Sequence, residues 1–200
     1  MTTAVKTISS LTCDTAPFAI RPEGTSDAVP RELLLDVCFG ENRNARTCQR
    51  LRDGRLPAES LAFTAERQGA LVGTVRLWHV SAGGGSTLVL GPLAVDPAFQ
   101  TLGIGGALMR HAIAEAQRLG HGSIVLLGDA PYYERFGFSA AKAEHIALPG
   151  PFERERMLGL ELRDGALAGV RGVLKPTGGA AARSKTSHFR KAPPATSRAA

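Results

Sequence analysis

The feature that most constrains this chain is the junction at residues 90–106, where an apolar segment, a glycine-rich turn and a helical pattern follow one another. The first N–H groups of a helix have no partner inside the helix, and the helix dipole is positive there. Gly103 and Gly105 permit a positive φ and keep side chains away from the backbone. The junction therefore predicts a strand–turn–helix unit whose backbone can bind a phosphate group.

A glycine-rich turn can also serve the fold alone, and two known phosphate loops can be tested by their spacing. A dinucleotide-binding GxGxxG motif that starts at Gly103 requires a glycine at position 108, which is Leu108. A Walker loop requires Gly-Lys-Ser or Gly-Lys-Thr, which does not occur in the chain. Neither nucleotide motif fits the junction.

Hydrophobic periodicity predicts strands and helices in mixed order, as in one α/β domain. Strands are expected at 18–21, 61–66, 71–80, 87–95 and 123–127, and the middle three form an antiparallel meander. Helices are expected after Ser26 or Asp27, at 42–51, at 105–119 and at 131–136. The first helix is predicted to bury Leu33, Leu34, Val37 and Cys38, and the third Leu108, Ala112, Ala116 and Leu119. Residues 143–147 and 156–162 are candidates for closing the sheet.

The run Gln100-Thr101-Leu102-Gly103-Ile104-Gly105 matches the Gln/Arg-x-x-Gly-x-Gly/Ala signature of the GNAT acetyltransferases, and the chain resembles this family. Residues 88–97 resemble the family's central strand, and Tyr133-Glu134-Arg135-Phe136-Gly137-Phe138 resembles its later Tyr-x-x-x-Gly-Phe element. The likeness extends over roughly residues 18–162. It implies a GNAT-type α/β fold whose mixed, mostly antiparallel central sheet is flanked by helices and splayed at the cofactor-binding strands.

The resemblance also implies a reaction, the direct transfer of an acetyl group from acetyl-CoA to a primary amine in a ternary complex without a metal. Backbone N–H groups of residues 100–106 are expected to bind the pyrophosphate, and the backbone around Leu93 and Val95 the pantetheine arm and the thioester carbonyl. An N–H fixed at that carbonyl stabilises charge that develops in the transition state. The expected cofactor-binding residues are Leu93, Ala94, Val95, Gln100, Thr101, Leu102, Gly103, Ile104, Gly105 and Gly106.

Tyr133 aligns with the family's general acid, which protonates the departing thiolate. The spacing to Gly137 and Phe138 selects Tyr133 over Tyr132, although packing is an alternative role for this ring. An ordinary tyrosine pKa of about 10 lies above a thiol pKa of about 8.5, so donation depends on the local environment. Many family members carry Asn shortly before this point; Asp129 stands here and either takes a related role or forms a turn.

A general base is not selected by the sequence. Glu41, Glu66 and His79 are candidates because they lie in segments that border the acceptor side in the family. An acyl-enzyme on Cys38 or Cys48 is disfavoured, because no linked histidine is evident. The sequence does not select the acceptor amine; the candidates are polyamines, amino sugars or antibiotics, amino acids and protein amines. An acyl-CoA-binding module without turnover is the alternative function.

The positive charge of the chain is concentrated at its C-terminal end. The chain has 24 Lys and Arg against 18 Asp and Glu, and six of the basic residues follow residue 174, which leaves 18 against 18 before it. We expect a flexible leader at 1–16, a catalytic domain at 17–172 and a basic disordered tail at 173–200. Nucleic-acid binding is disfavoured, because Phe189 is the only aromatic residue of that tail.

Three cysteines without CxxC spacing indicate free thiols, with neither a disulfide framework nor a zinc site. The N-terminal residues lack the apolar core of a signal peptide, and no apolar run approaches the ~20 residues that span a bilayer. We therefore expect a cytoplasmic protein without membrane partners. A homodimer, which is common in the family, is left open.

Overall fold

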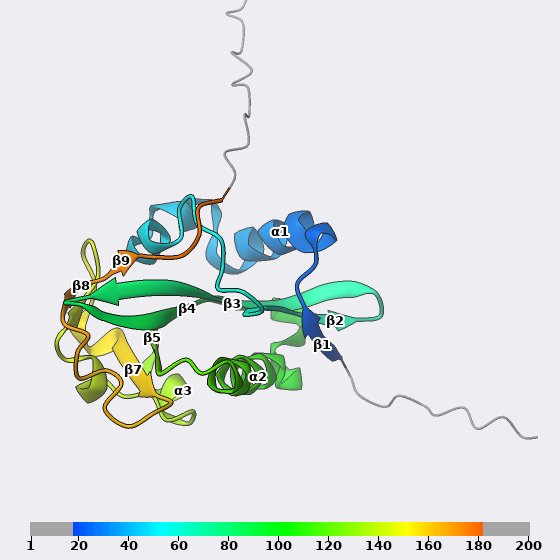
Figure 1. Cartoon of the computed structure of the whole chain (residues 1–200). Helices are drawn as coiled ribbons and strands as arrows, with labels where there is room; N and C mark the ends of the chain where they lie inside the picture. The colour runs from blue at the N-terminus through cyan, green and yellow to red at the C-terminus, as the bar shows by residue number, and fades with distance from the viewer. Residues whose placement is uncertain (1–17, 182–200) are drawn as a thin grey trace, which may run out of the picture.

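The computed structural model describes residues 18–181, and both the predicted leader at 1–16 and the chain after 181 lie outside the described residues. Figure 1 shows a twisted central sheet with helix α1 (Ala28–Phe39) over one face and helix α2 (Ile104–Arg118) over the other. The seven-stranded sheet has the order β1-β2-β3-β4-β5-β7, with β9 also paired to β3. The predicted mixed, mostly antiparallel sheet flanked by helices is confirmed.

Antiparallel pairs join β1 to β2, β2 to β3, β3 to β4 and β5 to β7, and the β4–β5 pair is parallel. Gln68 and Gly69 close the β2–β3 hairpin with positive φ angles of 52° and 78°, as tight hairpin turns require. The strands of this sheet are β1 (Ala19–Pro22), β2 (Ala62–Arg67), β3 (Ala70–Ala82), β4 (Gly85–Val95), β5 (Ser123–Leu127), β7 (Met157–Glu161) and β9 (Lys175–Pro176). The predicted meander is confirmed.

Shorter elements connect these strands and helices. They are η1 (Thr25–Asp27), η2 (Glu41–Ala45), η3 (Thr47–Leu51), η4 (Pro97–Leu102), α3 (Ala130–Glu134), η5 (Ala141–Ala143), β6 (Ile146–Ala147), η6 (Arg154–Arg156) and β8 (Gly172–Val173). The helix predicted at 42–51 is thus two 3-10 helices. Helix α2 buries Leu108, Met109, Ala112 and Ala116 against the sheet, largely as its periodicity predicts.

The predicted buried face of α1 is wrong in part. Leu33 and Val37 are 62% and 67% exposed, whereas Leu34 and Leu35 are buried and pack with Ala94 of β4. Apolar residues surround most of this helix, so periodicity alone does not select the face that meets the sheet. Leu119 is also 39% exposed, because it follows the last residue of α2.

The C-terminal part of the fold differs from the prediction at two points. The candidate segment at 156–162 does extend the sheet as β7, but β6 pairs with β8 in a separate two-stranded sheet. The tail predicted from residue 173 starts too early, because β9 pairs with Val80 and Ser81, and Leu174 is 1% exposed. Strand β3 is longer than β2, and its free edge beyond Leu77 offers backbone hydrogen bonds that β9 takes.

Candidate active site

Strands β4 and β5 diverge in the middle of the sheet. They pair only at Leu88–Ile124 and Val89–Val125, although β4 continues to Val95. The β3–β4 register shifts over Leu90–Leu93, where β4 has one residue more than β3. Such a bulge bends its strand and re-aims the groups that follow it. The sheet is therefore splayed next to β4, as the sequence predicts.

The backbone of Leu93 and Val95 faces this gap. The Asp96 N–H donates to the Val72 carbonyl at 2.9 Å, and antiparallel alternation then makes Thr74 and Ala94 a hydrogen-bonded pair. The N–H and C=O groups of the residues on either side of Ala94 consequently point to the β5 edge. Ala94 instead turns its backbone to β3, so this predicted cofactor residue does not present its N–H to the gap.

Two side chains confirm that the Val95 carbonyl is turned away from β3. It accepts a hydrogen bond from Cys38 Sγ at 3.3 Å and another from Gln100 Nε2 at 3.4 Å. Gln100, a signature residue, thereby ties the glycine-rich turn to the end of β4.

The glycine-rich turn leads directly into α2. Gly103 has φ 75° in the left-handed region, and a Cβ added there would meet nothing within 4 Å. The first α2 bond runs from the Ala107 N–H to the Gly103 carbonyl at 3.0 Å. The N–H groups of Ile104, Gly105 and Gly106 precede that bond, and the first turn of α2 contains no acidic residue. This helix start fits an anion, whereas the Ile104 side chain itself is buried in the core.

Two arginines that the sequence analysis did not select lie near this helix start. The Arg110 guanidinium is 3.5 Å from the Cβ position of Gly106, one turn earlier in α2. The Arg135 guanidinium lies 4.0 Å from the Tyr132 ring centroid, and the Tyr132 hydroxyl is 2.9 Å from the Cβ position of Gly105. The i, i+4 spacing from Gly106 is a signal that could have identified Arg110.

Tyr133 lies on α3, the short helix that follows β5. Its ring packs edge-to-face against Tyr132 and Phe138, with centroids 4.9 and 6.0 Å apart. A Cβ on Gly128 would lie 2.1 Å from Tyr133 Cε2, so this ring position requires glycine there. Burial raises the pKa of Tyr133 to about 12, with smaller contributions from Tyr132 and Asp129. The phenol is therefore neutral at physiological pH.

A cavity of about 1100 Å³ occupies the splay. Leu93, Gln100, Asp129, Tyr132 and Tyr133 line it on the side of β4 and α3. The opposite wall comes from α1, η2, η3, β3 and the segment 151–156, and it includes Glu32, Phe39, Arg43, Arg46, Cys48, Arg52, Arg76, Trp78, Phe152, Glu153 and Arg156. The structure thus brings Tyr133 and the end of β4 into one cavity.

The three base candidates are not brought into this cavity. Glu41 is exposed at the start of η2, Glu66 accepts from Arg21 Nε at 2.9 Å at the β1–β2 edge, and His79 lies beside His121. Asp129 precedes α3, where its carbonyl accepts from the Tyr132 and Tyr133 N–H groups. This geometry supports the turn-forming role of Asp129. Of the described residues that line the cavity, none is a histidine, so Cys48 has no histidine partner there.

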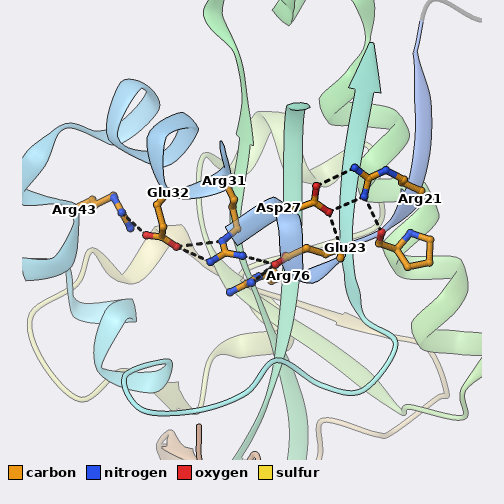
Figure 2. Close-up of polar contacts among 9 residues, drawn as sticks. Arg21, Glu23, Asp27, Arg31, Glu32, Arg43 and Arg76 are labelled. Carbon is orange, nitrogen blue, oxygen red and sulfur yellow. Dashed lines mark hydrogen bonds and ion pairs between the residues drawn. The ribbon is translucent and has the colours of Figure 1, made fainter. Parts of the chain in front are cut away.

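An ion-pair network supports the wall opposite to Tyr133 (Figure 2). Glu23, whose side chain is 7% exposed, binds both Arg31 of α1 and Arg76 of β3. Arg31 also contacts Glu32 at 2.8 Å, and Glu32 contacts Arg43 of η2 at 2.5 Å. The network joins α1 and η2 to β3, which is distant from them in sequence, and neutralises the arginines it holds in the cavity wall.

No helix in residues 18–181 is long and apolar enough to cross a bilayer. In the same range, no three His, Cys, Asp or Glu side chains are grouped so that they could share a metal ion.

A splayed sheet, a helix start that fits an anion and a phenol facing the gap together define the class of CoA-dependent acyltransferases. Residues 31–138 match the model of the Acetyltransferase (GNAT) family, and the chain belongs to this family.

Two relatives and two solved structures are similar over most of the chain. The uncharacterized N-acetyltransferase YhbS of Escherichia coli K12 is 28% identical over 78% of this chain and 94% of its own. YjhQ, an uncharacterized N-acetyltransferase of the same strain, is 30% identical over 68% of this chain and 76% of its own. The YhbS crystal structure with CoA gives a TM-score of 0.69, covering 81% of this chain and 91% of YhbS. The crystal structure of a GNAT acetyltransferase from Brucella melitensis with acetyl-CoA gives a TM-score of 0.57 at 28% identity. It covers 73% of this chain and 88% of the Brucella chain.

Proposed function

We propose that this GNAT protein transfers an acetyl group from acetyl-CoA directly to a primary amine. The observation that carries the proposal is the cavity at the splay, which is lined by the β4 edge, by Tyr133 and by Gln100 of the turn before α2. The open space around Gly103 and the absence of an acid in the first turn of α2 fit a pyrophosphate. Proteins similar to this chain contain CoA and acetyl-CoA in their crystal structures.

Each part of the cofactor half has a distinct task. The N–H groups of Ile104, Gly105 and Gly106 bind the pyrophosphate, with Arg110 adding positive charge. The gap-facing backbone of Val95 holds the pantetheine arm. The Leu93 N–H donates to the thioester carbonyl, and this bond strengthens as negative charge develops on that oxygen during attack by the amine.

Tyr133 completes the proton balance. The thioester supplies an activated acetyl group; the new bond is C–N and the broken bond is C–S. With a pKa of about 12, Tyr133 holds its proton firmly, so it acts first as a hydrogen-bond donor to the departing sulfur. Tyr133 then gives its proton to the sulfur and takes up a proton from the positively charged nitrogen of the attacking amine. The acceptor amine must enter the cavity in its neutral form.

A thiol-release assay tests the proposal. Wild-type protein and Tyr133→Phe are supplied with acetyl-CoA and a panel of polyamines, amino sugars, amino acids and lysine peptides. We expect transfer to at least one amine class and a fall in kcat of about 100-fold in the variant, the lower range for loss of a general acid. Acetyl-CoA affinity should not change. An unchanged kcat would assign Tyr133 to packing, and tight binding without transfer would identify an acyl-CoA-binding module.

A further inference from the structure

Arg52 differs from Arg43, Arg76 and Arg156, the arginines of the cavity wall that form ion pairs. Arg46 also forms no ion pair within residues 18–181, but it is exposed and lies over the Phe39 ring. Arg52 follows η3, and its guanidinium is 3.8 Å from the Cβ position of Gly91, where β4 leaves β5. Within residues 18–181 the Arg52 side chain forms no salt bridge, and its buried Nε has no hydrogen-bond partner. Asp53, the next residue, instead accepts a hydrogen bond from Gln49 at 2.7 Å. Arg52 is thus a cavity-lining cation without a counter-charge in the described structure.

The surroundings of Arg52 increase its need for an anion. Five arginines and three acidic residues line the cavity, namely Arg43, Arg46, Arg52, Arg76 and Arg156 against Glu32, Asp129 and Glu153. Arg43 and Arg76 are neutralised by the network of Figure 2, and Arg156 lies 3.6 Å from Glu153. Burial lowers the pKa of Arg52; Cys48 and Asp53 oppose this shift, and the positive charges of Arg43 and Arg46 reinforce it.

An unpaired buried charge is unfavourable, and arginine does not escape it by losing its proton. Its planar fork matches an oxyanion, above all a carboxylate that accepts two parallel hydrogen bonds. No such group is provided by residues 18–181, so the matching anion must come from outside this part of the protein. In the proposed function the acceptor enters this cavity, and Arg52 lies in its wall.

We propose that Arg52 binds the carboxylate of the acceptor, which makes the acceptor a free amino acid or another small amine with a carboxylate a few bonds from its nitrogen. This inference rests on the proposed function. Gly91, next to Arg52, is two residues before Leu93, a span of roughly 7 Å along a strand. A carboxylate held at Arg52 therefore leaves room for only a short connection to the attacking nitrogen. Lysine side chains of proteins lack such a carboxylate.

The test compares amino acids with their amides, and with aminoalkylphosphonates of equal length, in wild type, Arg52→Met and Arg52→Lys. Wild type should prefer the acid over the amide by about 10- to 100-fold in kcat/KM, the range for hydrogen bonds to a charged group. Most of the preference should lie in KM. Arg52→Met should abolish this preference, because kcat/KM should fall far more with the acids than with the amides, and Arg52→Lys should retain part of it.

A stability measurement separates binding from a structural role. Methionine keeps an apolar stem but removes the unpaired charge, so the Tm of Arg52→Met should equal or exceed that of wild type. Equal losses with acids and amides, or a lowered Tm, would overturn the proposal. A preference of wild type for phosphonates over carboxylates would also overturn it, because the anion would then be phosphate-like.

A further measurement keeps this inference distinct from the proposed function. N-acetyl amino acids are titrated into wild type and Arg52→Met in the presence of saturating CoA, which requires no turnover. Weaker binding to the variant by about 10-fold or more supports the carboxylate contact. Equal binding to both proteins would refute it even if acetyl transfer is observed, whereas absence of transfer alone would refute only the proposed function.

Discussion

The two halves of the cleft are built from different parts of the polypeptide. The proposed cofactor half is mainly backbone, namely the gap-facing edge of β4 and the start of α2 after the turn at 100–103. The proposed acceptor half consists of long charged side chains from several elements, held by ion pairs or, at Arg46 and Arg52, left without one within residues 18–181. Backbone can hold the constant groups of a common cosubstrate, whereas side chains define an individual acceptor. Damage to one half should therefore leave the other half working.

The largest expected effect is a loss of folding stability when the ion-pair network of the acceptor half is broken. Glu23→Gln removes a buried carboxylate that binds Arg31 and Arg76, whose side chains are 9% and 17% exposed. Leaving buried charges uncompensated costs about 3–5 kcal/mol, which denaturant unfolding should detect. Glu59→Gln is the matched control, because Glu59 is exposed and forms no ion pair within residues 18–181. Acetyl-CoA affinity of the folded variant should stay close to wild type; a large loss of affinity would contradict the separation of the two halves.

A smaller effect concerns Asp27, which precedes α1. Hydrogen bonds from Arg21 and the Gly24 N–H lower the pKa of Asp27 to about 2, from about 3.9 in an unfolded chain. The stabilisation is therefore complete above pH 4 and lost as the pH falls toward 2. Between pH 6 and pH 3 we expect a loss of about 1 kcal/mol, allowing for screening of the partly exposed Arg21. Unfolding of wild type and Asp27→Asn at both pH values measures it; an equal pH dependence in the two proteins would exclude this pair.

The strand–turn–helix geometry of the proposed cofactor half could be predicted from the sequence because its signals are local, whereas the cofactor contacts stay a prediction. The glycines at 103–106, the strand before them and the phenol of Tyr133 are read from short segments, and the structure places them around one splay. The prediction that Ala94 binds the cofactor through its backbone overlooks the two-residue period of a strand, which turns the Ala94 backbone to the edge opposite to that of Leu93 and Val95.

The acceptor half could not be predicted in the same way. Glu23 and Arg76 are 53 residues apart, and nothing local marks either as a partner of the other. Arg52 is equally unmarked, because its significance depends on burial and on the absence of a counter-charge. Strand β9 was missed for a related reason: it pairs with β3 through backbone, which leaves little trace in side-chain pattern.

The most direct test of the central claim is calorimetric titration of acetyl-CoA into wild type, Gly103→Glu and Gly103→Asn. Position 103 has φ 75° and open space around it, so asparagine, which tolerates this conformation, is the matched neutral control. We predict micromolar binding by wild type, affinity within about 10-fold for the asparagine variant, and a loss of at least about 100-fold for glutamate, whose charge repels the pyrophosphate. Failure of folded wild type to bind acetyl-CoA, or equal binding by the glutamate variant, would contradict the assignment of this turn to the cosubstrate.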